Sequence, residues 1–297
     1  MSTSENAWED FRLNTADGLT LYARDYGRGR DHQEDNAGLT VLCLPGLTRN
    51  SADFEDLAER LRGRFQIVAM DPRGRGRSDY DSDPANYQLK TYVADAFALL
   101  DAMGIDRVAL VGTSMGGLMS MLMTATAPQR VRGLVLNDVG PVVEASGLAR
   151  IQGYVGKQHP VTSWEDAVAV AKANNGAAFP HLSEAQWLAF ARRIFRENAE
   201  GRPELAYDPA ISQPIKQDQQ AAVPMDLWEV FDTLKAKPLL VIRGALSDIL
   251  SAETVAQMAA RHGSMEQAEV AGVGHAPLLT EPQAVGAIEE FLASLTG

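Results

Sequence analysis

Short apolar runs alternate with longer segments whose apolar residues recur at helical spacing. The apolar runs, which we predict to be strands, are 39–44, 65–70, 108–111, 131–136, 238–244 and 265–270. The segments with helical spacing are 54–61, 92–103, 118–126, 252–262 and 283–295. A nearly continuous apolar run is typical of a strand that is buried on both faces. Strands that alternate with helices predict an α/β protein with a doubly wound, mostly parallel sheet.

The ends of this alternating pattern carry two further features. Near the N-terminus, 8–14 and 19–26 have strand character and are joined at Asp17-Gly18, which is a hairpin signal. The polar stretch 27–38 predicts a surface loop. The stretch 141–232 contains no buried-strand run, and helical patterns at 165–173, 184–198 and 225–231 are punctuated by prolines. We therefore expect a core domain made of 1–140 and 233–297, with a helical insertion at 141–232.

The candidate chemistry begins at Gly112-Thr113-Ser114-Met115-Gly116, which lies directly between a predicted strand and a predicted helix. In a turn this tight the serine backbone adopts a strained conformation, and the flanking glycines remove side chains that would collide. The hydroxyl is then exposed beside the N-terminus of a helix, which favours negative charge. Ser114 is therefore a candidate nucleophile, and it requires a base oriented by a third group.

The best candidate for the base is His275. It lies in a glycine-rich loop directly after the last predicted strand, and loops at the carboxyl ends of parallel strands are where such sheets place their sites. The other histidines lie in the polar loop, in the insertion and at a helix end: His32, His159, His181 and His262.

The third group should be an acid at another strand end. Asp248 follows the strand that ends at Gly244, and Asp138 follows the strand 131–136. Both satisfy the chain order serine, acid, histidine. We favour Asp248, and Asp138 stays open as its rival.

Taken together, these segments resemble the α/β-hydrolase family. The nucleophile elbow is 112–116, and Leu44-Pro45-Gly46-Leu47 resembles the oxyanion loop of the family, with proline where a histidine is frequent. The stretch 71–78 matches the Asp-x-Arg-Gly-x-Gly-x-Ser turn, and the loops around Asp248 and His275 match the acid and histidine loops. The resemblance covers 8–140 and 233–297, and it implies that the insertion is a helical cap.

This resemblance implies a serine hydrolase of carboxylic esters or lactones that works through an acyl-enzyme. The catalytic residues would be Ser114, His275 and Asp248, and the backbone N–H groups of Leu47 and Met115 would form the oxyanion hole. Acyltransferases and perhydrolases use the same triad. Carbon–carbon bond hydrolases of ring-cleavage products do so too, but they often carry an aromatic residue where Ala276 follows the histidine. A ligand receptor with a retained triad is the alternative that is not an enzyme.

Composition narrows the partners. The net charge of −12 disfavours nucleic acid and anionic membranes, so a small ester-like molecule is the expected partner. The only cysteine, Cys43, lies in a strand and is expected to be buried and inert. No cluster of His, Cys or Asp has metal spacing, and we expect neither a metal nor a cofactor. Without a signal peptide or an apolar run of about 18 residues, we expect a cytoplasmic protein; the oligomeric state stays open.

The arginines near the predicted site are expected to have plain roles. Arg49, two residues after the oxyanion loop, is interpreted as a surface charge, with contact to an acidic substrate as the alternative. The arginines of the stretch 73–77 are interpreted as structural and solvated.

Overall fold

The fold is seen in a computed structural model that describes residues 7–27, 38–157, 160–217 and 226–296. All but the ends of the predicted polar loop 27–38 lie outside these ranges. Eight strands form one sheet in the order β1-β2-β4-β3-β5-β6-β9-β10. They are β1 (Glu9–Asn14), β2 (Thr20–Asp25), β3 (Thr40–Leu44), β4 (Gln66–Asp71), β5 (Val108–Thr113), β6 (Val131–Asn137), β9 (Leu239–Gly244) and β10 (Glu266–Val270).

The sheet is parallel from β4 to β10. Only β2 runs antiparallel to its two neighbours, β1 and β4. The turn at Asp17-Gly18 joins β1 to β2 as the sequence predicts, and Gly18 has the positive φ of 90° that this turn requires. The predicted α/β fold with a mostly parallel sheet is confirmed.

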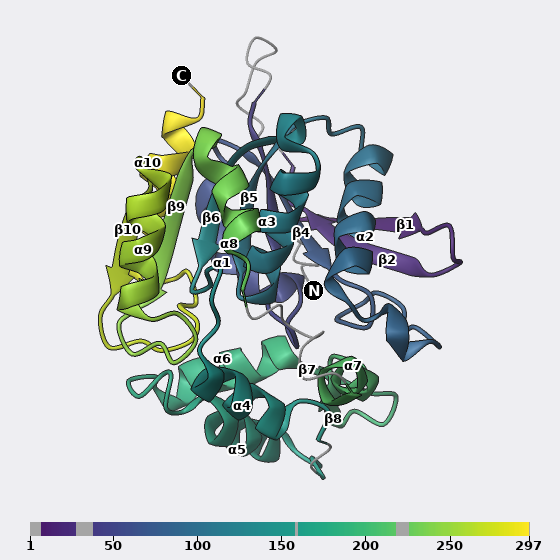
Figure 1. The fold of residues 1–297 in the computed structure, drawn as a ribbon. Coiled ribbons are helices and arrows are strands. Elements are labelled where there is room, and N and C mark those ends of the chain that lie inside the picture. The colour runs from purple at the N-terminus through teal and green to yellow at the C-terminus, as the bar shows by residue number, and fades with distance from the viewer. Residues whose placement is uncertain (1–6, 28–37, 158–159, 218–225, 297) are drawn as a thin grey trace.

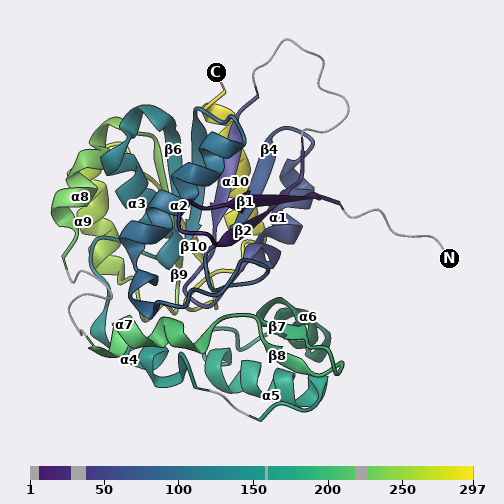
Figure 2. The same ribbon diagram turned by 90° about the vertical axis from the view of Figure 1, so that its right-hand side faces the viewer.

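Helices cover both faces of this sheet (Figures 1 and 2). They are α1 (Glu55–Leu61), α2 (Leu89–Ala102), α3 (Met115–Thr126), α8 (Trp228–Asp232), α9 (Ala252–His262) and α10 (Pro282–Ser294). Apolar residues of α2, α3, α8 and α9 share one core with alternate strand residues such as Leu42 and Leu110. Residues of α1 and α10 share the other core with the intervening strand residues, such as Val41 and Val111. Burial on both faces explains the continuous apolar runs.

A second group of elements lies beyond the carboxyl ends of the parallel strands (Figures 1 and 2). It contains α4 (Ala145–Tyr154), α5 (Trp164–Asn175), α6 (Glu184–Ile194), β7 (Phe195–Glu197), β8 (Pro203–Leu205) and α7 (Ser212–Gln217). We call this group the cap. Helices α5 and α6 each begin with a capping box, formed by Ser163 with Asp166 and by Ser183 with Gln186. They pack on each other around a small core of their own that includes Trp187 and Phe190.

The cap differs from the predicted insertion in its secondary structure. The helix predicted at 184–198 ends at Ile194, and the chain continues into the hairpin β7–β8. The side chain of Asn198 accepts hydrogen bonds from the N–H groups of Glu200 and Arg202, and Gly201 has a φ of 73°. This turn chemistry, followed by Pro203, stops the helix and reverses the chain.

Three more helices depart from the predicted pattern. Helix α7, which begins at Ser212 and contains Pro214, was not predicted. Helix α4 was not predicted, because glycines at 147 and 153 interrupt its apolar spacing. The helix expected at 225–231 is α8, which begins at Trp228 and packs with α3 against the sheet. Met225 itself lies outside the described residues.

We expect the strand cores to dominate stability. Leu42 in β3 is fully buried, so Leu42→Ala should lower the free energy of unfolding by about 2–5 kcal/mol. Leu188 on α6 is 37% exposed, and Leu188→Ala should change it by less than about 0.5 kcal/mol. Urea denaturation followed by fluorescence checks both values. Equal losses in the two variants would contradict the assignment of the core.

Candidate active site

The strand-to-helix turn between β5 and α3 places Ser114 in a strained conformation, with φ 51° and ψ −114°. Two close backbone approaches force this geometry. A Cβ on Gly112 would lie 2.3 Å from the carbonyl oxygen of Gly116, and a Cβ on Gly116 would lie 2.0 Å from that of Leu44. No other residue type fits either position, which explains the Gly-x-Ser-x-Gly pattern physically. The turn presents the Ser114 hydroxyl at the carboxyl edge of the sheet.

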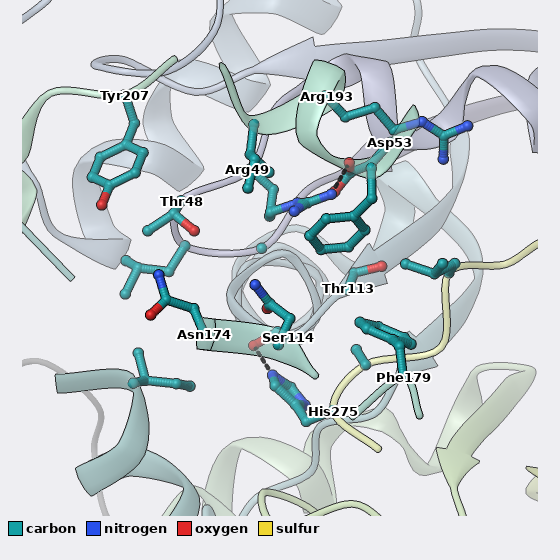
Figure 3. Close-up of a pocket in the computed structure, with 18 of the residues that line it drawn as sticks. Thr48, Arg49, Asp53, Thr113, Ser114, Asn174, Phe179, Arg193, Tyr207 and His275 are labelled. Atoms are coloured by element: carbon teal, nitrogen blue, oxygen red, sulfur yellow. Dashed lines mark hydrogen bonds and ion pairs between the residues drawn. The ribbon is translucent and has the colours of Figure 1, made fainter. Parts of the chain in front are cut away.

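His275 reaches this hydroxyl from the loop between β10 and α10. Its Nε2 lies 2.8 Å from Oγ of Ser114, and its side chain is only 8% exposed (Figure 3). The loop is anchored to the cap, because the N–H of Gly274 donates to the carbonyl of Ala178. The structure therefore brings together the serine and the histidine that the sequence singled out.

The carboxylate beside His275 belongs to Asp138. Its Oδ2 lies 2.8 Å from Nδ1 of His275, and its side chain is fully buried. Two further donors reach it from the end of β9 and from the loop that follows: the N–H of Gly244 at 2.9 Å and the hydroxyl of Ser247 at 2.6 Å. These three donors offset the cost of burying the carboxylate.

Asp248, which we favoured as the acid, lies elsewhere, and that placement was wrong. Its carboxylate accepts two hydrogen bonds from Arg150 of α4, at 2.6 and 2.8 Å, and its side chain is 35% exposed. The loop after β9 turns so that Ser247 faces Asp138 and Asp248 faces the cap. The hydrogen bonds from Arg150 hold the pKa of Asp248 below its usual range.

The sequence carried a weak signal for this arrangement. Strands β6 and β9 are neighbours in the sheet, so an acid after either one is within reach of the histidine loop. Asp138 directly follows the last residue of β6, whereas Asp248 comes four residues after β9. Only the short distance from the strand end distinguished Asp138, and chain order did not.

Two backbone donors flank the serine. Met115 is the first residue of α3, and Leu47 follows β3 in the neighbouring loop. Within the described part of the chain, no acceptor pairs with the N–H of either residue. Both residues adjoin the cavities that meet at Ser114. Unpaired N–H groups beside a nucleophile form a candidate site for a developing negative charge.

A buried arginine, Arg75, supports the loop that contains Leu47. Arg75 is fully buried, and its guanidinium donates to the carbonyls of Leu47 and Arg73 and to the hydroxyl of Tyr92. Its Nη2 also lies 3.8 Å from Sδ of Met115. The expectation that the arginines of this stretch are solvated was wrong for Arg73 and Arg75, because each has buried acceptors within reach.

Two cavities meet at Ser114, and Leu47, Ser114 and Ile151 line both of them. The first has a volume of about 120 Å³ and is lined by polar as well as apolar residues, including His275, Arg49 and Asn174 (Figure 3). The second has a volume of about 420 Å³ and is lined mainly by apolar residues such as Leu118 and Val143. We call the first, which is lined by Arg49, Asp53 and His275, the polar cavity and the second the apolar cavity, and Ser114 lies where they meet.

Arg49 and Cys43 are both largely shielded from solvent. Arg49 lines the polar cavity, and its side chain is 15% exposed, so the surface-charge interpretation was wrong. Cys43 is buried as expected, and burial raises the pKa of its thiol.

The described ranges 7–27, 38–157, 160–217 and 226–296 contain neither a metal cluster nor a membrane-spanning helix. They hold no group of three or more His, Cys, Asp or Glu residues that is arranged to bind a metal ion. No helix in these ranges is long and apolar enough to cross a membrane.

Comparison with known proteins identifies the family to which this chain belongs. The family model described as alpha/beta hydrolase fold matches residues 40–282. The chain is an α/β hydrolase. This confirms the resemblance that the sequence motifs indicated, and it makes the protein a hydrolase enzyme.

Relatives with described activities cover most of this α/β hydrolase. A 3-hydroxybutyrate-oligomer hydrolase from Cupriavidus necator is 34% identical over 84% of this chain and 87% of its own. A 2-(acetamidomethylene)succinate hydrolase from Mesorhizobium japonicum is 28% identical over 82% of this chain and 84% of its own. The crystal structure of an alpha/beta hydrolase from Novosphingobium aromaticivorans superposes with a TM-score of 0.91, at 42% identity, over 98% of this chain and 99% of that one.

The ion pair between Asp248 and Arg150 should make stability depend on pH. Because the pKa of Asp248 is lowered in the folded state, its contribution is present above the unfolded pKa of about 4 and is lost as pH falls through the folded value. Asp248→Asn should therefore be less stable than the wild type at pH 7, by about 1 kcal/mol or less for this partly exposed pair. The difference should narrow below about pH 4.

Thermal unfolding between pH 3 and pH 7 measures this difference. Asp106→Asn is a matched control, because the exposed Asp106 side chain forms no salt bridge with any described residue. A constant gap between Asp248→Asn and the wild type across this range would contradict the role of the pair.

Proposed function

We propose that this α/β hydrolase cleaves carboxylic esters, including lactones, through an acyl-enzyme on Ser114. The observation that carries the proposal is the hydrogen-bonded chain from Ser114 through His275 to Asp138, with 2.8 Å at each of its two links. A serine hydroxyl requires a base within hydrogen-bond reach, and a buried acid that orients this base completes the arrangement of a catalytic triad.

In the first half of the reaction, Nε2 of His275 takes the proton of Ser114 while Oγ attacks the ester carbonyl carbon. Asp138 fixes the ring with Nδ1–H toward its carboxylate, and it stabilises the imidazolium that forms. His275 then gives the proton to the alcohol oxygen as the C–O bond breaks. The alcohol leaves, and the acyl group stays on Ser114.

In the second half, His275 takes a proton from water, which attacks the acyl carbon. The tetrahedral intermediate collapses, Ser114 recovers its proton from His275, and the carboxylic acid is released. In both halves the carbonyl oxygen becomes negative. The free N–H groups of Leu47 and Met115 are the proposed donors to it, and one such donor is worth about 3 kcal/mol.

One of the two relatives supports an ester as the bond that is broken, whereas the name of the other, a 2-(acetamidomethylene)succinate hydrolase, contains no ester. An oligomer of 3-hydroxybutyrate, the substrate class in the name of the Cupriavidus necator relative, is joined by ester bonds. Acyl transfer, perhydrolysis and carbon–carbon cleavage would use the same triad with another acceptor or another bond. We favour hydrolysis of a small ester, because no specific feature of the described residues selects one of the others.

Removal of the nucleophile tests the proposal. With p-nitrophenyl butyrate, Ser114→Ala should lose kcat by at least about 10³-fold, because no other described residue offers a hydroxyl to His275. Release of p-nitrophenol measures the rate. Retention of the fold is checked by circular dichroism. Equal rates in the wild type and Ser114→Ala would overturn the serine mechanism.

Replacement of Asp138 and of Asp248, one at a time, tests which aspartate is the acid of the triad. Asp138→Asn should lower kcat by about 10³–10⁴-fold, because the amide does not stabilise the imidazolium. Asp248→Asn is the matched control and should lower kcat by less than about tenfold, since its carboxylate faces Arg150. If Asp248→Asn alone abolished activity, the assignment of Asp138 would be wrong.

A further inference from the structure

The two cavities at Ser114 determine which way round an ester can bind. His275 lines the polar cavity and does not line the apolar one. In the proposed mechanism the group that protonates the leaving oxygen must lie within hydrogen-bond reach of it. In that mechanism the alcohol part of the ester would occupy the polar cavity, and the acyl part would extend into the apolar cavity beside Leu118 and Val143.

The polar cavity carries an arginine close to the nucleophile. Arg49 lies in the loop after β3, and its Cγ and the Cβ of Ser114 both lie within 4 Å of the point that a Cβ on Gly46 would occupy. Its guanidinium lies over the ring of Phe190, 4.3 Å from the centroid. Its Nε donates to Asp53 at 2.7 Å (Figure 3). A second bond joins Nη2 to the same carboxylate. Ring and carboxylate hold the guanidinium in one orientation.

This orientation leaves one side of the guanidinium free. Asp53 occupies Nε and Nη2, and among the described residues nothing accepts a hydrogen bond from Nη1. Arginine is a planar fork with five donors, so a second oxygen anion can bind beside the first. Because the guanidinium is already immobilised, a ligand does not have to order it on binding.

The other arginine that lines the polar cavity does not point into it. The guanidinium of Arg193 is directed away from Ser114 and pairs with Asp56 (Figure 3). The apolar cavity has an acidic residue, Asp83, and no arginine or lysine among its described lining residues. Although Asp53 also lines the polar cavity, only this cavity, on the side where the alcohol leaves, has among its described lining residues a basic side chain with a free donor, Nη1 of Arg49.

We propose that Arg49 recognises a carboxylate on the alcohol part of the substrate through Nη1. The preferred substrates are then esters of hydroxy acids, with the free carboxylate on the leaving alcohol and an apolar acyl group. This assignment rests on the proposed ester hydrolysis. It further specifies that the alcohol end of the ester carries the charge and that Arg49 binds it.

The test compares two esters that differ only in this charge. Both 3-(butanoyloxy)butanoate and 3-(butanoyloxy)butanamide release butanoate, and the ratio of their kcat/KM values is the readout. Damage to the site as a whole lowers both values and cancels in the ratio. The wild type should prefer the carboxylate at least tenfold.

The decisive variant removes both charges of the pair, Arg49→Gln with Asp53→Asn, so that no unpaired aspartate remains to repel the substrate. Its ratio should fall at least tenfold, toward one. The matched control is Arg193→Gln with Asp56→Asn, which makes the same charge change on a guanidinium that points away. The control should keep the ratio of the wild type.

A third ester tests the direction. Ethyl hydrogen succinate carries its carboxylate on the acyl part, so its kcat/KM relative to that of ethyl butanoate should be the same in the wild type and in the Arg49/Asp53 variant. A fall in this ratio instead would overturn the direction. No preference in the wild type, or an unchanged preference in the Arg49/Asp53 variant, would overturn the role of Arg49.

Failure of the underlying function looks different. If butanoate release from both esters is as slow in the wild type as in Ser114→Ala, ester hydrolysis itself is wrong, and the assignment of Arg49 falls with it. If release depends on Ser114 but shows no charge preference, only the assignment of Arg49 is wrong.

Discussion

The buried carboxylate of Asp138 is the contact on which the rest of the site depends. A desolvated carboxylate is costly unless several donors surround it, and here the donors come from Gly244, Ser247 and His275. These residues lie at the end of β9, in the loop that follows it, and in the loop after β10. One buried charge therefore fixes three segments against the end of β6, and the histidine ring is oriented as a consequence.

The nucleophile is fixed by a different kind of constraint. Backbone atoms of β3, β5 and α3 approach so closely around Gly112 and Gly116 that no side chain fits between them. This close packing holds Ser114 at a positive φ without help from the cap. Arg75 also holds the loop that contains Leu47, because its fully buried guanidinium donates a hydrogen bond to the Leu47 carbonyl. The parts of the site that meet the reacting atoms thus belong to the sheet and its loops.

The sequence predicted this sheet-based part well, because its physical causes are local. Burial on both faces requires continuous apolar runs, and the elbow requires glycine at fixed positions. The cap was predicted less well. Turn chemistry at Asn198 and Gly201 overrides a helical pattern, and α4 contains glycines that weaken its periodicity. The acid was misplaced because two adjacent strands both end near an aspartate, and side-chain direction depends on contacts that no spacing reveals.

The same reasoning explains why Arg49 was misjudged. A charged residue two positions after a loop is usually solvated, and only the packing of α6 against that loop covers it. Phe190 of α6 supplies the ring on which the guanidinium lies, and the carbonyl of Arg193 accepts a hydrogen bond from Asn50 beside it. A contact 143 residues apart in the chain has no signature in a local pattern.

The position of the acid has a consequence for the cap. Because Asp138 faces His275, Asp248 is free to hold Arg150 of α4, and the N–H of Gly147 in the same helix donates to the Asp248 carbonyl. Helix α4 carries Ile151, which lines both cavities. In the loop after β9, Ser247 therefore donates a hydrogen bond to Asp138. The next residue, Asp248, binds Arg150 of α4, the helix that lines the cavities. Catalytic geometry and cavity shape are thereby linked through two consecutive side chains.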